Sequence, residues 1–163
     1  MVMLADAVRS PVVHAAEPRH VQRVLLAFDG SPGAWAALEQ AIDIAVSQNA
    51  LLTIAGVVEE PRVWLGYGPA VMPYTRETLV RDLERDMQQK LAAARDEVPA
   101  TVSVTTQLLH GRAARTLAAL AESGRYDLVV AGPRPVGRLR RLFGSSVTHS
   151  LLMRCGTSVL AVR

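Results

Sequence analysis

Short, almost unbroken apolar runs alternate along this chain with longer segments of helical periodicity. The runs cover residues 24–28, 51–58, 102–109, 127–131 and 158–162. Apolar runs of this length are typical of strands buried on both faces, as in parallel sheets. In the third run, alternate positions are held by Val102, Val104, Thr106 and Leu108. This alternation indicates a strand with one face more exposed to water, near a sheet edge.

The segments between these runs predict helices. Ser31 is a typical N-cap, and Pro32 suits the first helical position after it. Three further helices are expected over residues 75–96, 113–123 and 147–153. The apolar face expected for the first helix consists of Trp35, Leu38, Ile42, Ala45 and Val46. This alternation of strands and helices predicts one α/β domain, a doubly wound parallel sheet of five strands with helices on both faces and right-handed crossovers.

Length and composition fit one domain. The chain has 163 residues and is 50% apolar, so it can bury a sizeable core. We place the domain at residues 21–163 and expect residues 1–20, which lack periodicity, to form a flexible leader. An ordered arm that packs on a partner subunit is the alternative. No apolar run is long enough to span a bilayer, so we expect a cytoplasmic protein without a membrane partner.

Two kinds of site are excluded by composition. Because Cys155 is the single cysteine, the chain can form neither an intramolecular disulfide framework nor a thiolate-rich zinc site. The single lysine, Lys90, lies between Gln89 and Leu91, whereas a P-loop needs its lysine between a glycine and a serine or threonine. All other basic residues are arginines, and the formal net charge is +3.

The histidines do not indicate an enzyme. Their positions are His14, His20, His110 and His149, and none has a neighbour at the spacing of a metal site or a catalytic triad. We therefore assign no catalytic residue. The one candidate for a general base is Asp29.

Two unusual loops follow the carboxyl ends of predicted strands, where open α/β sheets bind ligands. Residues 29–31, Asp-Gly-Ser, follow the first strand, and residues 132–146 follow the fourth. If those strands are neighbours, both loops border one crevice. Asp29 would then accept a hydrogen bond from a ribose hydroxyl or an adenine amine. The alternative is that Asp29 only helps Ser31 to cap the helix.

The second loop has the composition of a phosphate site. Gly132, Gly137 and Gly144 allow close backbone approach, and the Gly-Ser-Ser sequence at 144–146 directly precedes a predicted helix. Backbone N–H groups and the dipole at a helix N-terminus favour anions. Positive charge is added by Arg134, Arg138, Arg140 and Arg141. The alternative is a polar surface loop. Few aromatics and an otherwise balanced charge argue against nucleic acid.

Together these segments resemble the universal stress protein family, from about Arg23 to Arg163. The resemblance is carried by residues 24–31, 52–58, 110–113, 126–132 and 158–163, in this order and spacing. It implies a sheet with strand order 3-2-1-4-5 and a homodimer formed through the last strand. One branch of the family binds ATP or related adenine nucleotides through the motif G-x-x-G-x9-G-[ST] after the fourth strand.

The resemblance also implies site residues. Ala27, Asp29 and Val57 would hold adenine and ribose, and the phosphates, with Mg²⁺ where present, would lie on the loop. The loop residues expected to bind are Gly132, Arg134, Gly137, Gly144, Ser145 and Ser146. ATP is the expected nucleotide, with AMP or ADP as alternatives.

The loop departs from the family motif. Pro135 stands at the second glycine and removes a backbone donor, and Gly137 comes two residues late. Gly144 comes one residue early, so either a residue is missing or Ser145 replaces the third glycine, with Ser146 as the hydroxyl. The leading hypothesis is a stress-response regulator that binds an adenine nucleotide as a homodimer, without efficient catalysis. The alternatives are a nucleotide-free dimerising module and a slow ATPase.

Overall fold

A computed structural model of the chain describes residues 20–59, 73–123, 125–132 and 147–162. Within these ranges, five strands and four helices alternate. They are β1 (Arg23–Ala27), α1 (Pro32–Gln48), β2 (Leu51–Val58), α2 (Pro73–Asp96), β3 (Val104–His110), α3 (Ala113–Glu122), β4 (Leu128–Ala131), α4 (Val147–Arg154) and β5 (Ser158–Ala161). The predicted leader up to residue 19 and the loop residues 133–146 lie outside the described residues.

All strand pairs of the sheet are parallel, and the strand order is β3-β2-β1-β4-β5. The predicted α/β fold, a doubly wound five-stranded sheet in this order, is confirmed. β3 lies at one edge, as its alternating pattern predicted, and β5 lies at the other. β1 lies in the centre, where Leu25 is in register with Thr53 of β2 and with Val129 of β4.

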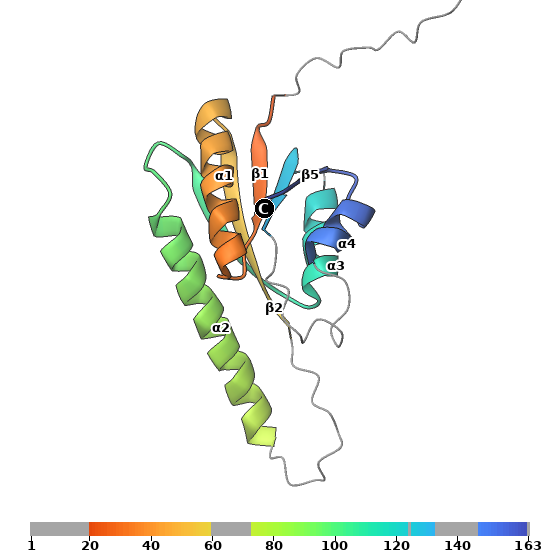
Figure 1. Ribbon diagram of the computed structural model, residues 1–163. Helices are drawn as coiled ribbons and strands as arrows, with labels where there is room; N and C mark the ends of the chain where they lie inside the picture. The colour runs from red at the N-terminus through yellow and green to blue at the C-terminus, as the bar shows by residue number, and fades with distance from the viewer. Residues whose placement is uncertain (1–19, 60–72, 124, 133–146, 163) are drawn as a thin grey trace, which may run out of the picture.

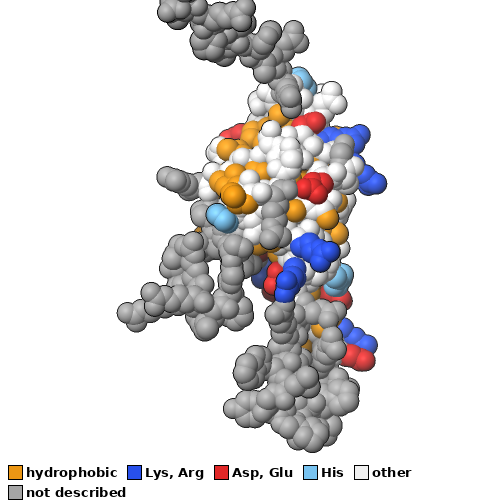
Figure 2. All heavy atoms as spheres, turned by 90° about the vertical axis from the view of Figure 1, so that its right-hand side faces the viewer, with side chains coloured by type: hydrophobic (Ala, Val, Ile, Leu, Met, Phe, Trp, Pro, Cys, Tyr) orange, Lys and Arg blue, Asp and Glu red, His pale blue; other side chains and the backbone are white. Residues whose placement is uncertain are grey.

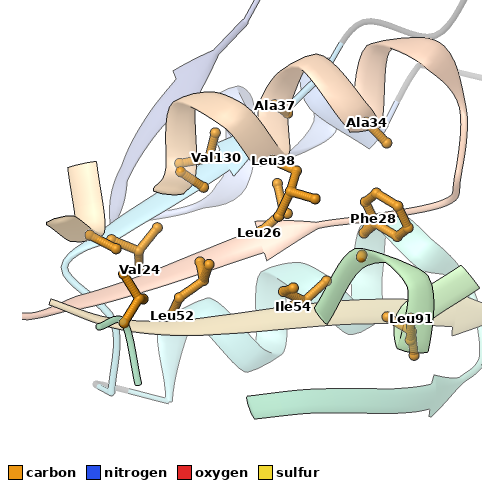
Figure 3. Packing of buried hydrophobic residues seen from close by; sticks show 14 of the residues in the cluster. Val24, Leu26, Phe28, Ala34, Ala37, Leu38, Leu52, Ile54, Leu91 and Val130 are labelled. Atoms are coloured by element: carbon orange, nitrogen blue, oxygen red, sulfur yellow. The ribbon is translucent and has the colours of Figure 1, made fainter. Parts of the chain in front are cut away.

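Helices cover both faces of this sheet. Figure 1 shows α1 and α2 on one side and α3 and α4 on the other. The core divides accordingly, because Val24 and Leu26 of β1 pack in the cluster that contains α1 and α2 residues, and Leu25 packs in the α3 cluster. These three side chains are 0% exposed. In Figure 3, Leu38 of α1 lies over Leu26. The unbroken apolar run of β1 therefore reflects burial on both faces.

Local signals set both ends of α1. Ser31 is its N-cap, and the Ser31 Oγ accepts a hydrogen bond from the Ala34 N–H at 3.2 Å. Asn49, with a positive φ of 52°, caps the other end and donates its N–H to the carbonyls of Ala45 and Val46. The predicted cap at Ser31 is thus confirmed.

The apolar face of α1 differs in part from the prediction. Val46 is 54% exposed, because successive helical residues point about 100° apart and its neighbour Ala45 occupies the buried face. The buried side chains are mostly alanines, which let α1 lie close to the sheet. They are Ala34, Ala37, Leu38, Ala41 and Ala45.

The apolar side chains of α2 are buried only towards its C-terminal end. Met87, Leu91 and Ala94 are buried, whereas Leu79 is 45% exposed. Figure 1 explains this gradient, since the first turns of α2 extend beyond the end of the sheet. None of the described helices is both long and apolar enough to cross a bilayer.

The packing of the core predicts that substitutions of two leucines will differ in their effect on the free energy of unfolding. We expect Leu26→Ala to lower the free energy of unfolding by about 2–5 kcal/mol, because it empties space between β1 and α1. Leu79→Ala, on the exposed end of α2, is the matched control and should cost less than about 1 kcal/mol. Urea denaturation measures both values. Equal losses would contradict this account of the core.

Candidate functional site

A cleft opens at the carboxyl ends of β1 and β4. These strands are neighbours, but β1 leads to β2 on one side of the sheet and β4 leads to β5 on the other. Such a reversal of winding is where α/β sheets bind ligands. The space between its walls, including open solvent at the mouth, is about 530 Å³. Its lining consists of Ala27, Phe28, Asp29, Ser31, Ala34, Val57, Ala113, Leu117, Ala131, Gly132, Val147 and Thr148.

The turn between β1 and α1 fixes Asp29. The Asp29 Oδ1 accepts a hydrogen bond from the Ser31 N–H at 2.9 Å, which is an Asx turn. Gly30 has a positive φ of 77°, and a Cβ at this position would lie 2.8 Å from the Cδ of Lys90 on α2. Asp29 thus both stabilises the turn and lines the cleft, so the two roles considered for it are compatible.

Small apolar side chains form the floor of the cleft. Ala27 and Ala131 are register partners at the ends of β1 and β4, and their methyl groups leave the space open. Val57 extends this floor towards β2. Phe28 is 3% exposed, and its ring centroid lies 5.1 Å from that of Trp35 at an interplanar angle of 88°. This edge-to-face pair gives the wall at Phe28 a fixed position.

Gly132 brings the end of β4 against α1. A Cβ at this position would lie 1.8 Å from the carbonyl oxygen of Gly33, in the first turn of α1. Only glycine allows this approach. The Gly132 carbonyl also accepts a hydrogen bond from the Thr148 Oγ1 of α4, at 2.9 Å. Gly132 therefore connects β4 to helices on both faces of the sheet.

The opposite end of the cleft lies between β2 and α3. There the Glu59 Oε1 accepts a hydrogen bond from the Ala113 N–H at 2.7 Å. The Gly111 N–H donates to the Val58 carbonyl at 3.1 Å. These two bonds connect the end of β2 to the start of α3, although the segments are distant in sequence.

The structure brings together four residues that the sequence singled out. Ala27, Asp29, Val57 and Gly132 all line the cleft, although their role in binding stays a prediction. The other predicted site residues lie outside the described residues and stay predictions as well. They are Arg134, Gly137, Gly144, Ser145 and Ser146.

Residues that line or border the cleft were also missed by the sequence reasoning. Glu59 follows the carboxyl end of β2 much as Asp29 follows that of β1. This similarity in position could have indicated Glu59 from the sequence. Thr148, in the first turn of α4, could have been found from its place after the glycine loop. Ala113 and Leu117 carry no chemical signal, because they line the cleft only through the position of α3.

The described histidines and the cysteine do not line the cleft. The His110 Nε2 is 3.6 Å from the Glu84 Oε1 of α2, and His110 does not line the cleft. His149 is exposed on α4. Cys155 is half-buried against the α3 cluster. The described residues contain no group of three or more His, Cys, Asp or Glu side chains that could hold a metal ion.

A doubly wound sheet with a cleft at its switch point is the architecture in which α/β domains bind ligands. The chain belongs to the universal stress protein family, whose sequence model matches residues 20–163. The resemblance stated from the sequence is thereby confirmed.

Individual relatives agree with this assignment. Universal stress protein A homolog 1 of Coxiella burnetii is 30% identical over 146 residues, which cover 88% of this chain and 96% of that protein. Stress response protein NhaX of Bacillus subtilis is 28% identical over 166 residues, which cover 88% of this chain and 99% of NhaX.

Solved structures share the fold. Universal stress protein UspA from Lactobacillus plantarum superposes with a TM-score of 0.66 at 21% identity, covering 87% of this chain and 97% of UspA. A universal stress protein crystallised in complex with cAMP gives a TM-score of 0.64 at 25% identity, covering 88% of this chain and 98% of that chain.

The tight approach at Gly132 generates a prediction about stability. We expect Gly132→Ala to lower the free energy of unfolding by about 1–3 kcal/mol, because the new methyl group collides with backbone atoms of α1. Gly156→Ala is the matched control, since a Cβ at Gly156 meets nothing within 4 Å, and it should change stability by less than about 1 kcal/mol. Chemical denaturation compares the two variants, and equal effects would contradict the close contact.

Proposed function

We propose that this chain is a stress-response regulator that binds ATP or a related adenine nucleotide in the cleft between β1 and β4. It acts in the cytoplasm as a homodimer, without efficient catalysis. The observation that carries this proposal is the convergence of Ala27, Asp29, Val57 and Gly132 on one cleft at the switch point. A relative at 25% identity that was crystallised with cAMP supports an adenine nucleotide as the ligand.

The nucleoside would occupy the floor of the cleft. Ala27, Ala131 and Val57 offer a shallow apolar surface of the kind on which a flat base packs. The Asp29 carboxylate is an acceptor suited to a ribose hydroxyl or the adenine amine. Its turn is held by the Ser31 N–H, so the acceptor is oriented before the ligand arrives.

The phosphates would lie beyond Gly132, towards α4. A phosphate there would meet the N-terminal end of α4, where backbone N–H groups and the helix dipole favour anions. We expect Gly144, Ser145 and Ser146 to supply donors, and Arg134 and Gly137 to complete the cradle, with Mg²⁺ where present. Arginines and helix-end amides would replace the donor that Pro135 removes.

Binding is tested with the full chain. Nucleotide released on denaturation of the freshly purified protein is identified by mass spectrometry, and ATP is then titrated by calorimetry. We expect Asp29→Asn to weaken binding roughly 10-fold, because it replaces a charged acceptor by a neutral one. The asparagine keeps an acceptor oxygen for the Ser31 N–H, so the turn should persist.

Asp43→Asn, an exposed position on α1, removes the same charge away from the cleft and should bind ATP like the wild type. Absence of released nucleotide together with absence of binding at millimolar ATP would overturn the proposal in favour of a nucleotide-free dimerising module. Phosphate release at a steady rate from bound ATP would instead favour the slow ATPase.

The homodimer would form through the free edge of β5. Among the described residues, β5 pairs with β4 on one side only. Beside it, Leu152 and Met153 of α4 are 52% and 72% exposed. Figure 2, which views the side of the molecule that carries α3 and α4, shows hydrophobic side chains gathered at the surface. An unpaired edge next to exposed apolar groups suits a two-fold symmetric contact.

Ala161→Pro tests this interface. The Val162 N–H bonds to the Ala131 carbonyl of β4, so by strand alternation the Ala161 N–H points away from β4 to the free edge. Proline at this position removes only an outward donor, which edge strands tolerate. We expect the variant to sediment as a monomer with its fold retained. Ala161→Val keeps the donor and should remain dimeric, whereas a dimeric Ala161→Pro variant would argue for another interface.

A further inference from the structure

A carboxylate from β2 occupies the N-terminal end of α3. The Glu59 Oε1 accepts the Ala113 N–H at 2.7 Å, across a sequence separation of 54 residues. Arg112, the N-cap residue of α3, makes no side-chain capping bond. The first turn of a helix leaves backbone N–H groups without partners inside the helix. One of these groups is satisfied by Glu59 instead of by a residue of the helix itself.

Glu59 directly follows the last residue of β2, and its bond to Ala113 of α3 places its carboxylate on the side of the sheet that carries the cleft. Ala55 is buried in the α3 cluster, and Val57, two residues on, packs against the same cluster and lines the cleft. Glu59 is the next residue on this face. Its partner Ala113 also lines the cleft. The Glu59–Ala113 bond therefore borders the cleft, because Ala113 lines it and Glu59 stands two residues after Val57, which also lines it.

The carboxylate changes the charge at this end of the cleft. An anion at a helix N-terminus offsets the positive end of the helix dipole. The Glu59 carboxylate occupies the N-terminal end of α3 and repels a phosphate from it. The other carboxylate of the cleft, Asp29, follows β1, whereas the described lining residues on the side of β4 and α4 carry no charge. They are Ala131, Gly132, Val147 and Thr148. The electrostatic potential thus differs between the two ends of one cleft.

We propose that Glu59 is a specificity-determining residue that fixes the direction in which the ligand lies. Its carboxylate excludes anionic groups from the α3 end and accepts a neutral hydrogen-bond donor there, such as a nucleoside hydroxyl or amine. The phosphate end of the ligand is confined to the side of β4 and α4. This inference rests on the proposed function, because it concerns a ligand with one neutral and one anionic end.

Two substitutions separate charge from capping. Glu59→Gln keeps a carbonyl oxygen that can accept the Ala113 N–H but removes the charge, whereas Glu59→Ala removes both. Glu122→Gln is the matched control, because it removes the same charge from an exposed position at the far end of α3. Each full-length variant is titrated with adenosine, which has no phosphate, and with ATP.

We expect Glu59→Gln to bind ATP roughly 3- to 10-fold more tightly than the wild type at low salt, because one repulsive charge has been removed. Its affinity for adenosine should change less than about 2-fold, and the gain for ATP should shrink at high salt as the charge is screened. Glu122→Gln should leave the ratio of the two affinities unchanged.

The outcomes distinguish this inference from the proposed function. A wild type that binds neither ligand overturns both. A wild type that binds ATP, with an unchanged ATP-to-adenosine ratio in Glu59→Gln, overturns only the role of Glu59. The role of Glu59 is also overturned if Glu122→Gln shifts the ATP-to-adenosine ratio equally, because the effect would then come from net charge. A salt-dependent shift confined to Glu59→Gln supports the proposal.

Discussion

The burial of β1 on both faces is the constraint on which the rest of the structure depends. Val24, Leu25 and Leu26 have no solvent exposure, and their side chains reach alternately into the two helical layers. A strand of this kind has to lie inside the sheet, with neighbours on each edge. Its neighbours are β2 and β4, whose connections run to opposite sides. The cleft at the end of β1 is thus a consequence of where β1 lies.

Local signals made most of the fold predictable. The apolar run of β1, the Ser31-Pro32 start of α1 and the polar alternation in β3 each depend on neighbouring residues only. Prediction failed at Val46, because periodicity alone could not tell how far around α1 the buried face extends. That extent depends on how closely the helix packs, which is a tertiary property.

The site could be predicted only where it follows the end of a strand. Asp29 and Gly132 stand directly after apolar runs, so their position relative to the sheet followed from topology. The Glu59–Ala113 contact could not be found in this way, because it requires knowing which helix begins beside β2. The width of the cleft could not be predicted either, because it depends on the register that places Ala27 opposite Ala131.

α1 rests on the sheet through alanines and touches β4 at Gly132 through backbone atoms. The distance between this helix and the sheet is therefore set by the smallest side chains available. A larger residue at Ala34 or Ala37 would push α1 outward and widen the gap at Gly132. A larger side chain at one of these positions should therefore be tolerated best when a second one of them is also substituted. In a collection of homologous sequences, this coupling would appear as correlated variation between the α1 alanines and the glycine that ends β4.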